Sequence, residues 1–261
     1  MLPPKLSIIT VNYNNLAGLQ KTVESVASQT WQDFEHIIID GGSTDGSVAF
    51  LESKSQQFSY CISEPDKGVY QAMNKGIAQA KGKYLLFLNS GDHFYKTNSL
   101  EKGIGSLGNH DLIYFNQNVV STIKTFIKEY PDDLSFAYFL KDNLPHQATF
   151  IKKDLFDKVG MYKEDFKIVA DWKFFIDSIC KYNVSYLHVN LTMTTFYVDG
   201  ISSFPENKKI IDAEKKKVLE ADYLAYAKDL EDVLKNMTII NNLRRSRIIK
   251  TLIRFGFLNK F

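Results

Sequence analysis

The residues NSGDH, 89–93, form a polar cluster directly after an apolar run that ends at Leu88. The cluster holds the carboxylate of Asp92 and the imidazole of His93, with the amide of Asn89 beside them. Hard divalent cations prefer oxygen ligands, and Mg²⁺ sites often combine one or two protein carboxylates with the phosphates of a substrate. The cluster could therefore be a sparse metal site, a metal-free binding loop or an ordinary turn, and its residue types leave these three open.

Asp40 is a second candidate, because it ends the apolar run FEHIIID and is followed by GGSTDG. This segment is a poor dinucleotide-binding fingerprint, since G-x-G-x-x-G would need glycine where Ser43 stands. A carboxylate at the end of a strand is suited to accept hydrogen bonds from a base or a sugar. Asp45 either contacts the same ligand or forms a turn and helix cap.

Two further segments carry groups that could move protons. Asp171 lies in VADWKFF, ahead of an apolar helix face, where its carboxylate could accept a proton from a reacting hydroxyl or cap the helix. His146 and Gln147 lie in NLPHQATF, after a proline and before an expected strand. They either face the same cleft or have a structural role.

Strand and helix patterns alternate over the first hundred residues and would bring the first of these groups together. The expected strands are 5–14, 34–40, 60–65 and 84–88, and the expected helices are 16–29, 48–57 and 69–82. Such repeats imply an α/β fold with a mostly parallel central sheet flanked by helices. Ligands bind beyond the carboxyl ends of the strands in such sheets. The polar clusters at 12–15, 40–46 and 89–93 all fall at those ends.

The second half of the chain has a different pattern. From about residue 110, short expected strands (111–120, 121–130 and 147–154) are separated by helices, which indicates a mixed half packed against the first. No linker rich in Gly, Ser or Pro separates the halves, so one continuous domain is expected. A charged helical stretch at 206–240 and a basic tail follow.

The composition, 44% hydrophobic and 24% charged over 261 residues, is typical of a globular protein. Cys61 and Cys180 have no metal-type spacing and fit a reducing compartment. Neither a signal peptide nor an apolar run of about 18 residues is present, so a cytoplasmic location is expected. The net charge of +2 divides into +6 over 241–261 and −4 over the rest, which argues against a nucleic-acid-binding face on the main body.

The tail, 241–261, predicts a helix with Arg247, Lys250 and Arg254 on one face and apolar residues over much of the rest. Such a helix can lie on an anionic membrane surface, which would make the protein peripheral on the inner face of the cytoplasmic membrane. The alternative is a helix that docks on the catalytic body or on a partner subunit.

Four stretches, taken in order, resemble the family 2 glycosyltransferases, which are inverting enzymes of the GT-A fold. They are SIITVNYN, IIIDGGSTDGS, SEPDKGVYQAMNKGIAQAKGKYLLFLNSGD and VADWKFF. The likeness covers positions 5 to about 205 and is closest to bacterial members that build cell-surface polysaccharides. It implies a GT-A catalytic domain at 1–205, followed by a helical extension at 206–261. Within the domain, 1–100 would bind the nucleotide-sugar and 101–205 the acceptor.

The resemblance also implies which residues bind the nucleotide-sugar. The ends of the first, second and fourth strands, together with the segment before the third helix, would contact the nucleoside and its diphosphate. These positions are Thr10, Asn12, Tyr13, Asp40, Asp66, Lys67, Gly68, Asn74, Asn89 and Ser90.

The family usually has an Asp-x-Asp cluster whose carboxylates bind Mn²⁺ or Mg²⁺ together with the donor diphosphate. Here Asn89 and Gly91 stand at the acid positions, which leaves Asp92 as the one expected protein carboxylate on the metal. Such a site should be weak without the nucleotide. A metal-free variant stays open.

Asp171 matches the catalytic aspartate of the family, although Ala170 stands where an acid commonly precedes it. The resemblance implies that Asp171 accepts the proton of the acceptor hydroxyl. His146, Gln147 and Trp172 are expected on the acceptor or diphosphate side, and Trp172 either packs beneath the acceptor sugar or lies in the core.

The expected function is therefore an inverting glycosyltransferase that moves a sugar from a nucleotide-sugar, UDP-linked by expectation, to a lipid-linked or oligosaccharide acceptor in surface polysaccharide biosynthesis. One alternative is a non-catalytic GT-A partner that only binds nucleotide. The replacement of the usual acids by Asn89 and Gly91 favours this alternative, and the presence of Asp171 argues against it. Another is a nucleotide-sugar pyrophosphorylase, but SIITVNYNN lacks the glycine and arginine of the triphosphate loop in those enzymes.

Overall fold

The computed structural model describes residues 3–198 and 204–229, together with residues 233, 246 and 251. The chain forms two compact units, Met1–Glu214 and Lys215–Phe261. Most of the basic tail, with its predicted membrane contact, lies outside the described residues. Within the described part of the chain, no helix is long and apolar enough to cross a bilayer.

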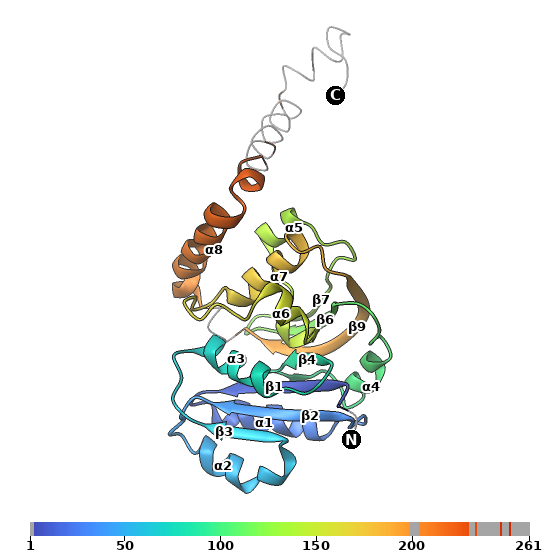
Figure 1. Ribbon diagram of the computed structural model, residues 1–261, viewed down its shortest axis with the longest axis vertical. Coiled ribbons are helices and arrows are strands. Elements are labelled where there is room, and N and C mark those ends of the chain that lie inside the picture. Colours follow the sequence, from blue (N-terminus) through green and yellow to red (C-terminus); the bar gives the residue numbers. More distant parts are fainter. Residues whose placement is uncertain (1–2, 199–203, 230–232, 234–245, 247–250, 252–261) are drawn as a thin grey trace. The chain divides into compact units, whose positions relative to one another are not determined.

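Four parallel strands form the first half of the sheet, in the spatial order β3-β2-β1-β4 (Figure 1). Asn12 is level with Asp40, and Asp40 with Ser63, so three of the strands end at one edge. β2 and β4 lie on opposite sides of β1, which makes this edge the kind of switch point where α/β sheets bind ligands. The strands and their connecting helices are β1 (Leu6–Asn12), α1 (Leu16–Ala27), β2 (Phe34–Asp40), α2 (Ser47–Ser53), β3 (Tyr60–Ser63), α3 (Val69–Gln79) and β4 (Tyr84–Phe87).

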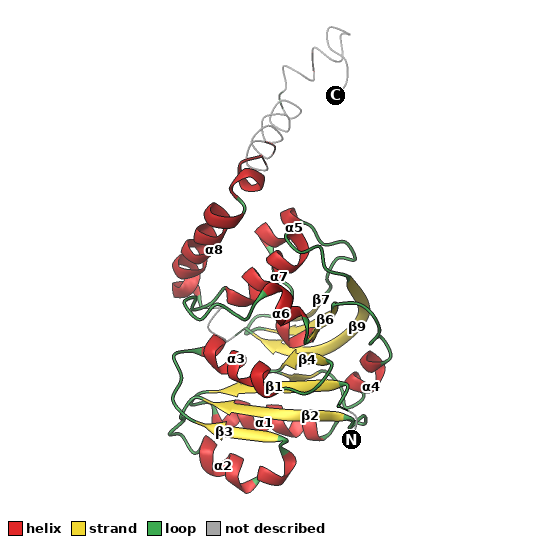
Figure 2. Ribbon diagram, viewed as in Figure 1, coloured by secondary structure: helices red, strands yellow, loops and turns green. Residues whose placement is uncertain are grey.

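Helices cover both faces of this half of the sheet (Figure 2). Ile8 of β1 belongs to a buried cluster with Val26 of α1. The next residue, Ile9, points to the other face, where a Cβ added to Gly76 of α3 would lie 2.4 Å from its Cγ2 atom. Because the strands are buried on both faces, their sequences are continuous apolar runs rather than alternating ones.

The second half of the sheet contains antiparallel pairs. β8 (Thr149–Lys152) is antiparallel to both β4 and β6 (Leu112–Val120), while β9 (Tyr186–Tyr197) is parallel to β6. The short strands β5 (His93–Phe94) and β7 (Thr125–Lys128) pair with β9 and β6. The result is one nine-stranded mixed sheet, which confirms the predicted α/β class.

Aromatic rings hold helix α7 (Ala170–Cys180) in place. Phe174 of α7 stacks on Phe156 with ring centroids 4.6 Å apart, and both rings contact Tyr162. Tyr162 also lies 5.4 Å from Phe87, the last residue of β4. Aromatic pairs contribute about 0.5–1.5 kcal/mol each beyond their buried area, so the cluster fixes α7 against the end of β4.

The other helices are short, apart from α8, which begins in the first unit and continues into the second. They are α4 (Ser99–Ile104), α5 (Phe136–Lys141), α6 (Leu155–Val159) and α8 (Lys208–Asp222), with 3₁₀ turns at Ser55–Gln57, His146–Ala148 and Pro205–Asn207.

Candidate active site

The three polar clusters of the first half meet at the carboxyl edge of the sheet, as the sequence predicts. Asn12 lies at the centre, where its Nδ2 donates to Asp40 Oδ1 at 2.7 Å and its Oδ1 accepts from the Ser90 hydroxyl at 2.6 Å. Asn15, the N-cap of α1, donates to the carbonyl oxygen of Ser90 at 3.2 Å. The ends of β1, β2 and β4 therefore form one hydrogen-bonded surface.

Asp40 is the hub of the loop that follows β2. Its side chain is fully buried and accepts hydrogen bonds from the hydroxyls of Ser43 and Ser63, both at 2.6 Å. Burial alone would raise its pKa, but the hydrogen bonds from Ser43, Ser63 and Asn12 outweigh burial and lower the pKa below its ordinary value. The carboxylate is thus ionised and directed into the protein, where it shapes the loop.

Tyr13 and Asp66 converge on Gly41. A Cβ at Gly41 would lie 2.7 Å from Asp66 Oδ2 and 3.2 Å from Tyr13 Cδ2, so only glycine fits between them without movement. Asp66 Oδ1 accepts from the backbone N–H of Gly68 at 2.9 Å, and Lys67 between them is exposed. The Tyr13 side chain is 67% exposed and offers a ring face on which a flat base could stack.

Thr22 of α1 holds the loop that carries Asp92, a role that the sequence analysis missed. Its buried hydroxyl accepts from the N–H of Gly91 at 3.0 Å and donates to the carbonyl oxygen of Asp92 at 2.7 Å. The same hydroxyl lies 3.0 Å from the carbonyl of Gly18, the common position for a helical threonine. No pattern in the sequence distinguishes the two roles.

The acidic side chains offer little to a metal ion. Among the described residues, no group of three or more His, Cys, Asp or Glu side chains is placed to hold one. His93 is bound to the carbonyl of Phe94 at 2.8 Å and to the hydroxyl of Tyr197 at 3.2 Å. Asp92 is the one acid of this loop, and a single carboxylate fits a cation only where a ligand supplies further oxygens.

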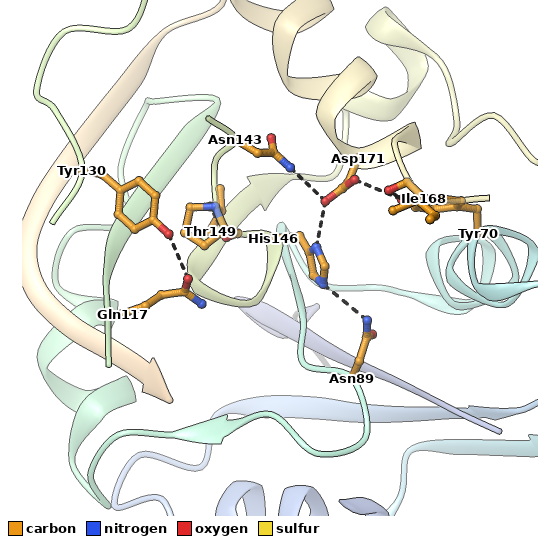
Figure 3. A network of polar contacts seen from close by, with 10 residues as sticks. Tyr70, Asn89, Gln117, Tyr130, Asn143, His146, Thr149, Ile168 and Asp171 are labelled. Atoms are coloured by element: carbon orange, nitrogen blue, oxygen red, sulfur yellow. Dashed lines mark hydrogen bonds and ion pairs between the residues drawn. The ribbon is translucent and has the colours of Figure 1, made fainter. Parts of the chain in front are cut away.

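Asp171 lies at the centre of a buried polar network (Figure 3). Its Oδ1 accepts from the Tyr70 hydroxyl at 3.0 Å, and its Oδ2 accepts from Asn143 Nδ2 at 3.1 Å. His146 Nδ1 lies 3.0 Å from the same Oδ2, and His146 Nε2 lies 3.3 Å from Asn89 Nδ2. The network thus joins the first turn of α7 to the loop after β4. Asp171 is not the helix cap, because Val169 occupies that position.

The electrostatics of this network favour a charged carboxylate. Burial would raise the pKa of Asp171, but the hydrogen bond and charge of His146 outweigh burial and lower it. Burial would likewise lower the pKa of His146, but the hydrogen bond and charge of Asp171, with the charge of Asp92, raise it. The negative charge of Asp92 therefore contributes to the raised pKa of His146.

The Glu214 carboxylate holds the backbone segment before α7 in place, a role that no pattern in the sequence indicates. Its carboxylate accepts from the backbone N–H groups of Lys167, Ile168 and Val169 at 2.6, 3.1 and 3.2 Å. The carbonyl of Ile168 in turn contacts the Tyr70 hydroxyl, so that it shares the single hydrogen of this hydroxyl with Asp171 Oδ1. Side chains from α8 and α3 therefore fix the backbone on which Asp171 stands.

Besides Asp40, which is fully buried, four predicted site residues lie in packed positions. Thr10 is fully buried and bonds to His36 at 3.0 Å, because its position in β1 directs it under α1. Asn74 clamps the backbone of Tyr162, accepting from its N–H at 3.1 Å and donating to its carbonyl at 2.9 Å. Gln147 is buried. Trp172 takes the core alternative: it is 1% exposed and donates to the carbonyl of Phe139 at 2.7 Å.

Solved structures of glycosyltransferases match this fold. TarS of S. aureus, residues 1–349 in complex with UDP-GlcNAc, matches 84% of this chain with a TM-score of 0.64 and 16% identity. The chain spans 67% of that fragment, and 66%, just under two thirds, in another structure of it. The mannosyltransferase PcManGT of Pyrobaculum calidifontis, solved with GDP-Man and Mn²⁺, matches 77% of this chain and 59% of its own, with a TM-score of 0.58 and 12% identity. The fold is the GT-A fold.

Sequence comparisons agree. An uncharacterized glycosyltransferase of Mycobacterium tuberculosis is 39% identical over 178 residues, 66% of this chain and 68% of that protein. A PGL/p-HBAD biosynthesis glycosyltransferase of the same species is 35% identical over 180 residues, 67% of this chain and 69% of that protein. The model of glycosyl transferase family 2 matches residues 7–165, more than half of the chain. The chain therefore belongs to glycosyl transferase family 2 and is a glycosyltransferase.

Proposed function

We propose that this glycosyltransferase acts with inversion and moves a sugar from a UDP-linked donor to a hydroxyl of a lipid-linked or oligosaccharide acceptor, in the synthesis of a bacterial surface polysaccharide. The observation that carries the proposal is the network from Asp171 to Asn89. It places a buried, ionised carboxylate in contact, through His146, with the loop where ligands bind in this class of sheet.

The donor would lie along the carboxyl edge of β1, β2 and β4. The exposed ring of Tyr13 is suited to stack on the base, and Asp66, in contact with Gly41, is suited to the ribose. Lys67 is exposed and offers a charge to the diphosphate. Asn12 and Ser90 bond to each other at the strand ends, and Asn89 lies in the same loop as Ser90, so these three offer polar groups to the donor. TarS was solved with UDP-GlcNAc, which supports a UDP-linked donor for a chain with the same fold.

A divalent metal would bind here only together with the donor. Asp92 would be its protein carboxylate, and the two phosphates of the donor would supply the other oxygens. Enzymes with this fold typically use Mn²⁺ or Mg²⁺, and PcManGT was solved with Mn²⁺. A bound cation would offset the negative charge that develops on the departing diphosphate.

Asp171 is the carboxylate on which deprotonation of the acceptor would depend. Inverting transfer is a single in-line displacement, so the acceptor hydroxyl has to lose its proton as its oxygen attacks the sugar. A well-placed base contributes about 10²- to 10⁴-fold to such a step.

The acceptor would be membrane-bound if it is lipid-linked. The basic tail, 241–261, is then suited to bring the enzyme to the anionic inner surface of the cytoplasmic membrane. Flotation of the full chain with vesicles of anionic or neutral lipid tests this, and equal binding to both would contradict it.

The function is tested by binding and turnover on the full chain. Thermal shifts with UDP, GDP and their common sugars, each with and without Mn²⁺, should show stabilisation by UDP ligands that increases with the metal. A donor that binds should be hydrolysed slowly, and NMR of the first product should show the opposite anomeric configuration. Retained configuration would rule out inversion, and binding without turnover of any donor would favour the non-catalytic alternative.

A further inference from the structure

We infer that the hairpin formed by the end of β6 and by β7, residues 118–128, docks on an anionic lipid surface and holds the catalytic edge of the sheet close to it. This contact is separate from the one proposed for the basic tail. The lipid contact can be tested by itself, whereas its purpose, to bring the site to a lipid-linked acceptor, rests on the proposed function.

The first observation is a group of exposed apolar side chains on this hairpin. Ile123 in the turn is 92% exposed, and Phe126 and Ile127 of β7 are 39% and 42% exposed. A single exposed apolar residue is common on a protein surface, but several together mark a site of interaction. Because successive side chains of a strand point to opposite faces, the exposure of both Phe126 and Ile127 shows that both faces of β7 are open to solvent.

The second observation is that the turn holds these side chains in a defined arrangement. The N–H of Ser121 donates to the carbonyl of Lys124 at 3.0 Å, and the Ser121 hydroxyl accepts from the N–H groups of Ile123 and Lys124 at 3.3 and 3.1 Å. On the strands, Val119 is level with Phe126. Since the hairpin is already ordered, binding of its tip to a surface costs less conformational entropy.

The third observation is the place of the hairpin beside the loop that carries Asp92. The His93 ring contacts the hydroxyl of Tyr197 at 3.2 Å, and Tyr197 of β9 is level with Val120 of β6. The N–H of Val198, an exposed residue, donates to the carbonyl of Val120 at 3.0 Å. One strand, β9, thus lies between the short strand after Asp92 and the root of the hairpin (Figure 1). A surface bound by the hairpin would therefore lie next to the site.

The fourth observation is the charge of the hairpin. Residues 112–128 contain two lysines and no acid. Lys124 Nζ lies 4.6 Å from the centroid of the Phe126 ring, and Lys128 is paired with Asp142 at 2.7 Å. At the root, Lys21 Nζ lies 3.8 Å from the centroid of the Tyr197 ring. Apolar side chains interleaved with lysines fit an anionic bilayer surface, where the apolar groups enter the interface and the ammonium groups meet the headgroups.

A second copy of the chain fits the hairpin less well. β7 is an edge strand, because within the described residues it pairs with β6 alone. Antiparallel pairing of two copies about Phe126 would place Lys124 of each copy opposite Lys128 of the other, and like charges directly opposite each other are destabilising. Lysine on an edge strand is a common device against such pairing. The pairing would also leave Ile123, in the turn, outside the paired strands, whereas a lipid surface accommodates all three apolar side chains.

Flotation of the full chain tests the contact, with vesicles of phosphatidylglycerol and phosphatidylcholine and with vesicles of phosphatidylcholine alone. The triple variant Ile123→Ser, Phe126→Ser, Ile127→Ser should partition onto the anionic vesicles about 10-fold less than the wild type. Lys124→Gln should partition about 5-fold less, the effect of one basic residue at an anionic surface. Every variant keeps the tail, so the tail cannot cause a difference.

Met161→Ser is the matched control for flotation, because Met161 is as exposed as Ile127 but lies outside the hairpin. It should partition like the wild type. Equal partitioning of the triple variant and the wild type would overturn the inference, as would a wild type that binds neither kind of vesicle.

A fluorescent probe at the tip locates the contact without removing apolar groups. Ile123→Trp should show blue-shifted emission with anionic vesicles and quenching when the lipids carry bromine, after subtraction of the wild-type signal of Trp31 and Trp172. Met161→Trp should show neither change. An unchanged spectrum of Ile123→Trp on vesicles that bind the protein would assign the binding to another part of the chain and overturn the inference.

Two further measurements separate this inference from its alternatives. If sedimentation shows a wild-type dimer and a monomeric triple variant, the hairpin is an interface between copies and the inference is wrong. Hydrolysis of UDP-GlcNAc without lipid should be the same in the wild type and the triple variant. If the hairpin binds lipid but no donor is turned over, the proposed function is wrong and the lipid contact stands.

Discussion

The two halves of the catalytic unit build their parts of the site in different ways. In the first half, the loops after β1, β2 and β4 bond directly to one another through Asn12, Asp40 and Ser90. In the second half, Asp171 depends on groups from distant segments, such as Tyr70 and His146. The strand ends therefore shape a surface for a ligand, whereas the network behind them sets the state of one carboxylate. Changes in the first half should affect binding, and changes in the second should affect the chemical step.

The largest effect is expected from Asp171→Asn. The amide cannot hold His146 as an anion does, so kcat for a donor that binds should fall by about 10²- to 10⁴-fold. The Kd for UDP, measured by calorimetry, should stay the same, because the strand-end surface is untouched. A large loss of UDP affinity would contradict the assignment of binding to the first half and of the chemical step to the second.

Asp40→Ala should damage both stability and binding. It would leave the buried donors of Asn12 and Ser43, and the more exposed hydroxyl of Ser63, without their acceptor, at a cost of about 3 kcal/mol in the free energy of unfolding. UDP affinity should also fall, because the loop after β2 loses the carboxylate that holds its hydrogen-bond donors together. Urea unfolding and calorimetry measure the two effects. Asp45→Ala is the control, since that carboxylate bonds in an exposed turn and its loss should cost less.

Tyr13→Ala should affect binding alone. The side chain is 67% exposed, so the free energy of unfolding should change by less than about 0.5 kcal/mol. Loss of a stacked base should weaken UDP binding by about 1–3 kcal/mol. Tyr182→Ala, which removes another exposed ring, should leave the Kd unchanged. Equal effects of the two variants would remove Tyr13 from the proposed base site.

Thr22→Val keeps the shape of the side chain but removes the acceptor of the Gly91 N–H and the hydroxyl that donates to the Asp92 carbonyl. We expect a loss of about 1 kcal/mol in the free energy of unfolding. The gain in UDP affinity that Mn²⁺ provides should shrink, because the loop with Asp92 is loosened. Thr30→Val, at an exposed bond to Glu101, is the control. An unchanged Mn²⁺ effect would show that Thr22 does not position Asp92.

The smallest effect concerns stability and pH. The raised pKa of His146 means that its contribution is full below its ordinary pKa of 6.5 and is lost as pH rises through the folded value. The lowered pKa of Asp171 means that its contribution is present above 3.8 and is lost as pH falls through the folded value. The difference in free energy of unfolding between wild type and His146→Gln should therefore be larger at about pH 5 than at about pH 8.5. A difference that grows with pH would contradict the pairing.

The sequence predicts the first half of the fold well because its signals are local. Strands buried on both faces read as apolar runs, and the polar residues that end them lie at one edge of a parallel sheet. The second half is predicted less completely. The sequence pattern does not predict the twelve-residue strand β9, Tyr186–Tyr197, whose partners β6 and β5 are distant in sequence.

The site shows the same limit at single residues. Asp171 could be singled out as a proton acceptor, but its companions Tyr70 and Asn143 could not, since their role depends on tertiary contacts. The sequence does not decide whether Trp172 packs in the core or beneath the acceptor sugar, and only the hydrogen bond from its indole to the carbonyl of Phe139 shows that it lies in the core. For the same reason, nothing in the sequence distinguishes Thr22 from an ordinary helical threonine.

The contact of Glu214 has a practical consequence for shortening the chain. A fragment cut at residue 205, where the catalytic domain was expected to end, would retain every predicted site residue. It would nevertheless lose the acceptor of three consecutive backbone N–H groups just ahead of Asp171. The minimal piece worth expressing should therefore extend past Glu214, and a shorter piece that still binds UDP but turns over poorly would be a foreseeable artefact of truncation.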